Sequence, residues 1–305
     1  IAANSIDRYL QNASLTANRG KEDSYESTLY TSLEGVVSQP VTPMSDQVTG
    51  YTIDEALRES ERCLLCECLE CVKVCEYLAH YKSYPKRYVR EIYNNLSIVM
   101  GIHHSNKMIN SCSLCGLCAE VCPNKLNMGE ICIEARRMMV AKGKMPPSTH
   151  DFPIRDMNFS NSKEFKLSRH QPGTSSSKTV FFPGCQFSAS YPSHVKSIYQ
   201  HLYDKIDGGV GLMLGCCGAP AGWAGQENLF SETMASFEKD WKELGKPAII
   251  TACPSCFYIL KNGLSDVSVE TVWTVFDRVG LPETEGSKLH SMKLAVHDSC
   301  TTRFE

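Results

Sequence analysis

The sequence lacks the features of a membrane protein, a secreted protein or a nucleic-acid-binding protein. No apolar run approaches the roughly 18–20 residues that a transmembrane helix requires, and the first residues do not have the pattern of a signal peptide. The net charge is −3, so there is no excess of positive charge to attract nucleic acid. We therefore expect a cytoplasmic protein with no membrane span and no nucleic-acid partner.

A complete nucleotide-binding loop is also missing. No G-x-G-x-x-G fingerprint occurs in the sequence. The glycine-bearing stretch GGVGLMLG, residues 208–215, predicts a strand rather than a phosphate-binding loop. The chain alone is therefore not expected to hold NAD or a flavin.

Cysteine is what the sequence has in excess. The 305 residues include 16 cysteines, more than core packing explains, and most of them stand in tight groups. In a secreted protein such groups would indicate disulfides, whereas in a reducing compartment they favour metal binding.

The stretch SCSLCGLCAEVCP, residues 111–123, has the cysteine spacing of a bacterial ferredoxin. In this spacing three thiolates surround one [4Fe–4S] cluster, and the fourth binds the other cluster of a pair. Gly116 lets the backbone approach the inorganic sulfides. Zinc sites commonly use two CxxC pairs separated by a longer loop, so zinc fits poorly. The predicted ligands are Cys112, Cys115, Cys118 and Cys122.

A second cysteine run is needed for a pair of clusters, and RCLLCECLECVKVC supplies it with one thiol in surplus. Its cysteines are Cys63, Cys66, Cys68, Cys71 and Cys75. We prefer Cys63, Cys66 and Cys71 for the first cluster. Cys122 would close that cluster, and Cys75 would close the second one. A second assignment uses Cys68 in place of Cys66, and the choice between them stays open.

Helices are predicted around these runs. Residues 1–10 have the pattern of the end of a helix from a preceding domain, and a linker follows to residue 50. A helix begins after Thr52, with Glu55 at the capping-box position. Helical apolar spacing returns over 88–96 and 128–139, with no clear strand. Residues 51–143 are therefore predicted to form an α-helical ferredoxin domain with two [4Fe–4S] clusters.

A proline-bearing linker is predicted over residues 144–177, and the pattern then changes. Short apolar strands are expected at 179–182, 211–214, 248–251 and 293–296, with amphipathic helices near 193–206 and 227–244. This alternation of strands and helices indicates an α/β domain over residues 178–305.

Five more cysteines directly follow the first three of these strands. They are Cys185 in FFPGC, Cys216 and Cys217 in GCCGAP, and Cys253 and Cys256 in TACPSC. The carboxyl ends of parallel strands meet at one edge of a sheet, so these thiols are expected to converge. Gly215 and Gly218 flank the adjacent pair and allow a turn that directs both thiols to one site.

The spacing C-x30-CCG-x34-C-x2-C resembles the cysteine-rich CCG domain of heterodisulfide reductase catalytic subunits. Related proteins include iron–sulfur subunits of glycerol-3-phosphate, glycolate and lactate oxidising systems. The order of the two domains resembles that of fused heterodisulfide reductase-like proteins. The resemblance implies that the five cysteines bind a further [4Fe–4S] cluster, cubane or non-cubane, at which a disulfide is reduced.

The two ends of the sequence resemble parts of a longer polypeptide. AVHDSC, which ends at Cys300, matches the opening of a second CCG repeat that Glu305 cuts short, so Cys300 joins the predicted metal ligands. Either the sequence is part of a longer polypeptide, which we favour, or another chain completes the site. The start, AANSIDRYLQNASLTANRG, resembles the last helix of flavin-dependent pyridine nucleotide-disulfide oxidoreductases of the glutamate synthase small-subunit type. This second resemblance implies FAD on a preceding domain or on a partner, and the start at Ile1 suggests a cut or processed chain.

The remaining candidates have ordinary interpretations beside the functional ones. Cys132 is predicted to be a buried thiol, and His103 and His104 are expected at the surface. His297 and Asp298 could serve a proton or a thiolate, or form a capped turn. A basic group could dock a redox partner or be a solvated face; it comprises Lys82, Lys86, Arg87 and Arg90.

Two functions follow from these patterns. In the first, electrons pass from a flavin through the two clusters to the CCG site, where a disulfide or another small two-electron acceptor is reduced. In the second, the chain is a relay subunit that exchanges electrons with other redox subunits and performs no chemistry of its own. A zinc scaffold serves as the control hypothesis. The cluster load makes an anaerobic source plausible.

Overall fold

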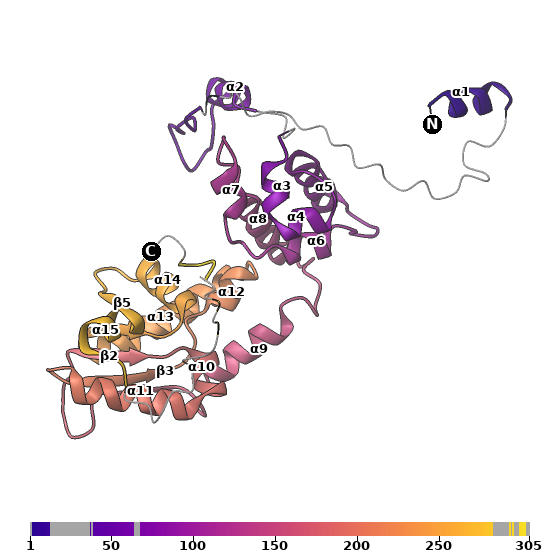
Figure 1. Ribbon diagram of the computed structural model, residues 1–305. Helices are drawn as coiled ribbons and strands as arrows, with labels where there is room; N and C mark the ends of the chain where they lie inside the picture. The colour runs from indigo at the N-terminus through magenta and orange to yellow at the C-terminus, as the bar shows by residue number, and fades with distance from the viewer. Residues whose placement is uncertain are drawn as a thin grey trace.

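The structure is a computed structural model that describes residues 2–12, 37, 39–63, 68–282, 293, 295 and 299–302 (Figure 1). Four predictions fall wholly or partly outside these residues. They concern the linker that ends at residue 50, Cys66, the strand at 293–296, and the pair His297 and Asp298. In the part of the chain that is described, no helix has the length and apolar character of a membrane span.

The first helices agree with the sequence analysis. Helix α1 spans Ala2–Leu10, and helix α2 spans Ile53–Glu61. Thr52 caps α2 through the predicted capping box, because its hydroxyl accepts from the Glu55 amide and the Glu55 carboxylate accepts from the Thr52 amide. The same carboxylate accepts from the Ser45 amide at 3.0 Å, so it fastens the preceding segment to the helix.

The Glu55 carboxylate makes the stability of the start of α2 depend on pH. The hydrogen bond from the Thr52 amide, with that from Ser45, lowers the pKa of Glu55 from 4.5 to about 2. Because the pKa is depressed in the folded state, the stabilisation is present above pH 4.5 and is lost as the pH falls toward 2. We expect the amides of Ser45 and Thr52 to lose protection from hydrogen exchange over this range. Glu55→Gln should remove the dependence, whereas the neighbouring Asp54→Asn should leave it intact.

A helical domain follows, and no strand occurs among the described residues of 51–143, as predicted. Its helices are α3 (Glu70–Val74), α4 (Glu76–His80), α5 (Pro85–Ser97), α6 (Asn106–Ser111), α7 (Leu117–Val121) and α8 (Met128–Ala141). Helix α3 packs against α7, while α5 and α6 pack against α8. Buried apolar side chains from these helices form one core together with several cysteines.

The segment predicted as a linker, 144–177, is partly structured, which corrects that prediction. Helix α9 covers Asp151–Ser160, and strand β1 covers Leu167–Arg169. Pro153 is compatible with α9 because it lies in the first turn, where the backbone N–H makes no hydrogen bond within the helix. Strand β1 pairs antiparallel with β3, so tertiary pairing orders a stretch of low strand propensity. The rest of the segment, residues 144–150, 161–166 and 170–177, has no helix or strand.

The α/β domain contains a five-stranded mixed sheet in the order β1-β3-β2-β4-β5. Strands β2 (Thr179–Phe182), β3 (Val210–Leu214), β4 (Ala248–Thr251) and β5 (Val269–Thr271) are parallel. The helices are α10 (Cys185–Ser190), α11 (Pro192–Lys205), α12 (Ala219–Trp223), α13 (Glu227–Glu243), α14 (Pro254–Gly263) and α15 (Val272–Val279). The predicted fold class, a helical ferredoxin domain followed by an α/β CCG domain, is confirmed at this level.

Alternate side chains of β2 enter the two cores of the α/β domain. Val180 and Phe182 pack with residues of α13 and α14, whereas Phe181 packs with residues of α11 and α15. The sheet is therefore covered on both faces, as expected for a parallel arrangement. The cysteines lie at the edge of the sheet where its parallel strands end.

Candidate metal centres

Three neighbouring strands bring the CCG cysteines to one edge of the sheet. Strand β2 lies between β3 and β4, and all three run parallel. Cys185 follows β2, the pair Cys216 and Cys217 follows β3, and Cys253 and Cys256 follow β4. The strand that precedes the single cysteine thus lies between the two strands that precede the pairs.

The five thiols form one continuous row of contacts. Hydrogen bonds link Cys185 to Cys216 and Cys216 to Cys217. The row continues from Cys217 to Cys256, and from Cys256 to Cys253. The structure therefore brings together all five of the thiols that the sequence analysis assigned to this edge.

Two glycines shape the backbone around this row. Gly184, with φ +90°, lies against the β4 cysteines, and a Cβ added there would be 2.9 Å from the Cys253 Cβ and 3.3 Å from the Cys256 Sγ. Gly218, with φ +87°, turns the chain after Cys217 into helix α12. Both conformations favour glycine, so the sequence specifies the turns that aim the thiols at each other.

The row also eases deprotonation of some of its members. The hydrogen bond from Cys216, with that from Cys256, lowers the pKa of Cys217 to about 5. The hydrogen bond from Cys256 lowers the pKa of Cys253 to about 6. Conversely, the bond to Cys216 and burial raise the pKa of Cys185. Since the thiolate is the form that binds metals, the row can supply soft anionic ligands near neutral pH.

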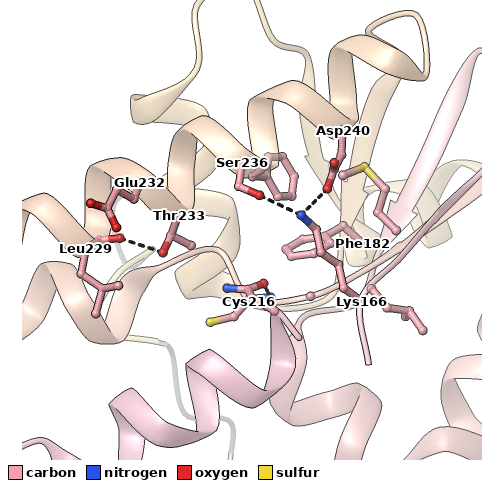
Figure 2. A pocket seen from close by; sticks show the side chains of 13 residues that line it. Lys166, Phe182, Cys216, Leu229, Glu232, Thr233, Ser236 and Asp240 are labelled. Carbon is pink, nitrogen blue, oxygen red and sulfur yellow. Dashed lines mark hydrogen bonds and ion pairs between the residues drawn. The ribbon is translucent and has the colours of Figure 1, made fainter. Parts of the chain in front are cut away.

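A pocket of about 190 Å³ adjoins the row on the side of helix α13 (Figure 2). Lys166 bridges one wall, with its Nζ 2.6 Å from Asp240 and 2.8 Å from the Ser236 hydroxyl. Asn161, at the end of α9, accepts from the Cys216 amide at 2.9 Å. The sequence analysis missed Asn161 and Lys166 because both lie in the segment that it interpreted as a linker.

In the helical domain, the second cysteine run surrounds α7. Cys112 ends α6, Gly116 begins α7 with φ +72°, and Cys122 ends α7. Cys118 is buried within the helix, and its sulfur accepts from the Met128 amide at 3.3 Å. An amide directed at a cysteine sulfur is a typical contact of an iron–sulfur ligand.

The first run repeats this geometry around α3. Leu69 begins α3 with φ +56°, as Gly116 begins α7, and Cys75 ends α3. Cys71 is buried at the second position of its helix, as Cys118 is in α7. Cys68 precedes the left-handed residue as Cys115 precedes Gly116. Of the described residues, Cys68 therefore matches Cys115, while Cys66 lies outside the described part of the chain.

The two runs approach each other at two places. At one place, Cys118 lies in the electrostatic range of both Cys112 and Cys75. At the other, the Arg62 guanidinium donates to the Asn124 carbonyl at 2.9 Å, and the Asn124 amide group donates back to the Arg62 carbonyl. The chain at Cys63 thus lies beside the residues that follow Cys122.

The other candidates lie as follows. Cys132 is fully buried as predicted, and contacts Cys112 and the Tyr77 hydroxyl. His103 is half-buried and bonds to the Asn95 carbonyl at 2.8 Å, while His104 is exposed. Cys300 is exposed. All four members of the basic group are exposed, and Arg87 pairs with Glu91.

The donor sets have the chemistry of iron–sulfur ligands. A [4Fe–4S] cluster has four irons, each of which takes its own thiolate. Rows and runs made of cysteine alone, with backbone amides directed at the sulfurs, suit that larger group.

Comparisons with known proteins agree with this interpretation. Residues 62–127 match the model of a 4Fe-4S dicluster domain, and residues 179–261 match that of the CCG cysteine-rich domain. One subunit of the fumarate reductase (CoM/CoB) of Methanothermobacter marburgensis is 23% identical over 260 residues, which cover 77% of this chain and 50% of that protein. An uncharacterized iron-sulfur protein of Methanococcus maripaludis is 22% identical over 261 residues, which cover 78% of this chain and 51% of that protein. No solved structure matches.

The chain spans about half the length of these curated relatives. It contains a 4Fe-4S dicluster domain and a CCG domain, and it is homologous to a subunit of a reductase. The resemblance drawn from the cysteine spacings is confirmed, and the chain is an iron–sulfur electron-transfer protein.

Proposed function

We propose that this iron–sulfur chain is the part of a reductase that delivers electrons to a disulfide. Electrons enter from a flavin or NAD(P)H module on a preceding domain or on a partner subunit. They cross the ferredoxin domain and reach the CCG site. Two electrons and two protons convert the disulfide into two thiols, and the clusters, once bound, supply the single-electron steps.

The observation that carries this proposal is the row of five thiols. A conventional cluster needs four cysteine ligands. The row from Cys185 to Cys253 therefore has one thiol more than such a cluster uses. The extra thiol gives the site capacity for a cluster of unusual form. Asn161 holds the Cys216 amide, and Gly184 admits the β4 cysteines, so contacts from outside the row support it.

We also assign the ligands of the ferredoxin domain. The match between α3 and α7 leads us to prefer Cys68 over Cys66, with Cys63 and Cys71, for the first cluster. Cys122 closes this cluster from the other run. Cys112, Cys115 and Cys118 hold the second cluster, which Cys75 closes.

One observation favours the second candidate, a relay subunit of a dehydrogenase complex of the glycolate, lactate or glycerol-3-phosphate type. The central thiols of the row are enclosed, with exposed fractions of 2% for Cys216, 3% for Cys217 and 2% for Cys256. A disulfide must reach the metal, whereas an electron can pass through several ångströms of protein. The relay function therefore does not require that a substrate has access to the thiols of the row.

Metal content and turnover separate these functions. We expect about twelve irons and as many sulfides per full-length chain purified anaerobically, and reduction of small disulfides by the dithionite-reduced protein. About twelve irons without turnover of any disulfide, but with electron exchange to an artificial acceptor, would support the relay. Zinc in place of iron would exclude both functions.

A further inference from the structure

Arg136 on helix α8 is a charged side chain in an unusual position. It is only 2% exposed, and each of its three guanidinium nitrogens donates a hydrogen bond. Its acceptors are backbone carbonyls, whereas the ion pairs at this point of α8 are made by the exposed neighbour Arg137. A buried cation is costly unless negative charge lies nearby.

The partners of Arg136 belong to both domains. Nε and Nη2 donate to the Ile109 carbonyl at 3.2 and 3.1 Å, and Nη2 donates to the Cys112 carbonyl at 2.6 Å. Nη1 donates to the Trp223 carbonyl at 2.7 Å. Trp223 ends helix α12, which begins directly after Gly218 and the pair of cysteines that follows β3. One side chain thus connects a cysteine of the ferredoxin run to the helix that leaves the CCG row.

Two further contacts hold the same interface. Gly225, with φ +75°, lies so close to α8 that an added Cβ would be 2.6 Å from the Arg137 amide nitrogen and 2.7 Å from the Arg136 carbonyl carbon. The Arg137 guanidinium pairs with Glu227 at 2.9 Å. The backbone of α8 therefore packs directly on the turn between α12 and α13.

We propose that Arg136 is a positioning residue that couples the two metal centres. Its buried charge stabilises the reduced, more negative form of the cluster that Cys112 holds, and so raises the reduction potential of that cluster. Through Trp223 it also fixes the separation across which electrons leave the ferredoxin domain. The proposal rests on the ligand roles proposed above. The cluster charge would supply the negative partner that the guanidinium requires, since net charge and hydrogen bonds set the potential of such clusters.

The test uses the full-length holoprotein, purified anaerobically. In Arg136→Met, a redox titration followed by electron paramagnetic resonance should show one ferredoxin cluster with a lower potential and the other unchanged. We expect at least a tenfold change in the oxidised-to-reduced ratio at fixed potential, which is about 59 mV for one electron. Arg137→Gln, which removes the exposed neighbouring charge, is the matched control and should shift neither cluster. Unchanged potentials in Arg136→Met, or an equal shift in Arg137→Gln, would overturn the proposal.

If iron analysis shows that Arg136→Met loses a ferredoxin cluster, Arg136→Lys decides the matter. Lysine keeps the charge but cannot span the Cys112 and Trp223 carbonyls together. We expect potentials like those of the natural protein, and at least tenfold slower electron transfer to the CCG site after rapid reduction. If Arg136→Lys transferred electrons to the CCG site as fast as the natural protein does, the proposal would be overturned. Failure of the natural protein to reduce any disulfide would argue against the proposed function only, because the potentials are measured independently.

Discussion

Replacement of Gly184 by alanine is expected to empty the CCG site while the two ferredoxin clusters stay bound. The new Cβ would lie 2.9 Å from the Cys253 Cβ, a distance that real Cβ atoms do not adopt, and 3.3 Å from the Cys256 Sγ. The position of the Cys253 Cβ is fixed by its backbone, so β2 and the start of α14 must separate. We expect about four fewer irons per chain and a loss of about 1–3 kcal/mol from the free energy of unfolding.

The backbone conformation contributes to this result, and Gly173→Ala measures that contribution. Gly173 has a similar φ of +81° but no atom within 4 Å of an added Cβ. The control variant therefore carries the strain of an alanine at positive φ without the steric clash. It should keep the full iron content. If Gly184→Ala also kept all its iron, the close packing of Gly184 on the β4 cysteines would not be needed for the site.

The strands beside the cysteines could be predicted from the sequence, whereas the edges of the sheet could not. TVFF and AIIT are short apolar runs, and they form β2 and β4 over the predicted residues. Strand β5 has the sequence VET and strand β1 has LSR, each only three residues long. Such segments carry too weak a pattern to indicate a strand, and pairing with β4 and β3 is what orders them.

The cysteines of the site could be predicted for a similar reason, because each group stands at the end of a strand whose place in a parallel sheet follows from its pattern. The supporting residues have no such signal. Asn161 reaches Cys216 from 55 positions away, and Arg136 reaches Trp223 from 87 positions away. Neither residue belongs to a motif. Their roles come from how α8 and α9 pack, which spacing alone does not encode.

Helix α14 could have been predicted in full. The sequence analysis used PSC only as part of a cysteine motif, yet Pro254 at the first helical position, followed by apolar spacing through Leu260, is a helix signal. The omission matters for the site. Cys256 is buried because it lies in the first turn of this helix, whereas Cys253 lies just before it and is half-buried.

The second large effect is expected from pairs of cysteine substitutions in the ferredoxin domain. If the runs exchange their last ligands, Cys75 and Cys112 serve the same cluster, although they lie in different runs. Cys75→Ala combined with Cys112→Ala should then remove only one cluster and leave about four irons in this domain. Cys75→Ala combined with Cys122→Ala should remove both clusters, although the two variants each lack two cysteines.

The geometry gives this result its physical reason. Cys118 lies in the electrostatic range of Cys112 and of Cys75, while the reciprocal contacts of Arg62 and Asn124 hold the first run beside the end of the second. Each cluster would therefore tie α3 to α7, and loss of both should unfold the domain, whereas loss of one leaves the two helices joined. Iron analysis and thermal melting of both double variants test this. If each run kept its own cluster, the first pair would lose all its iron and melt early, as the second pair would.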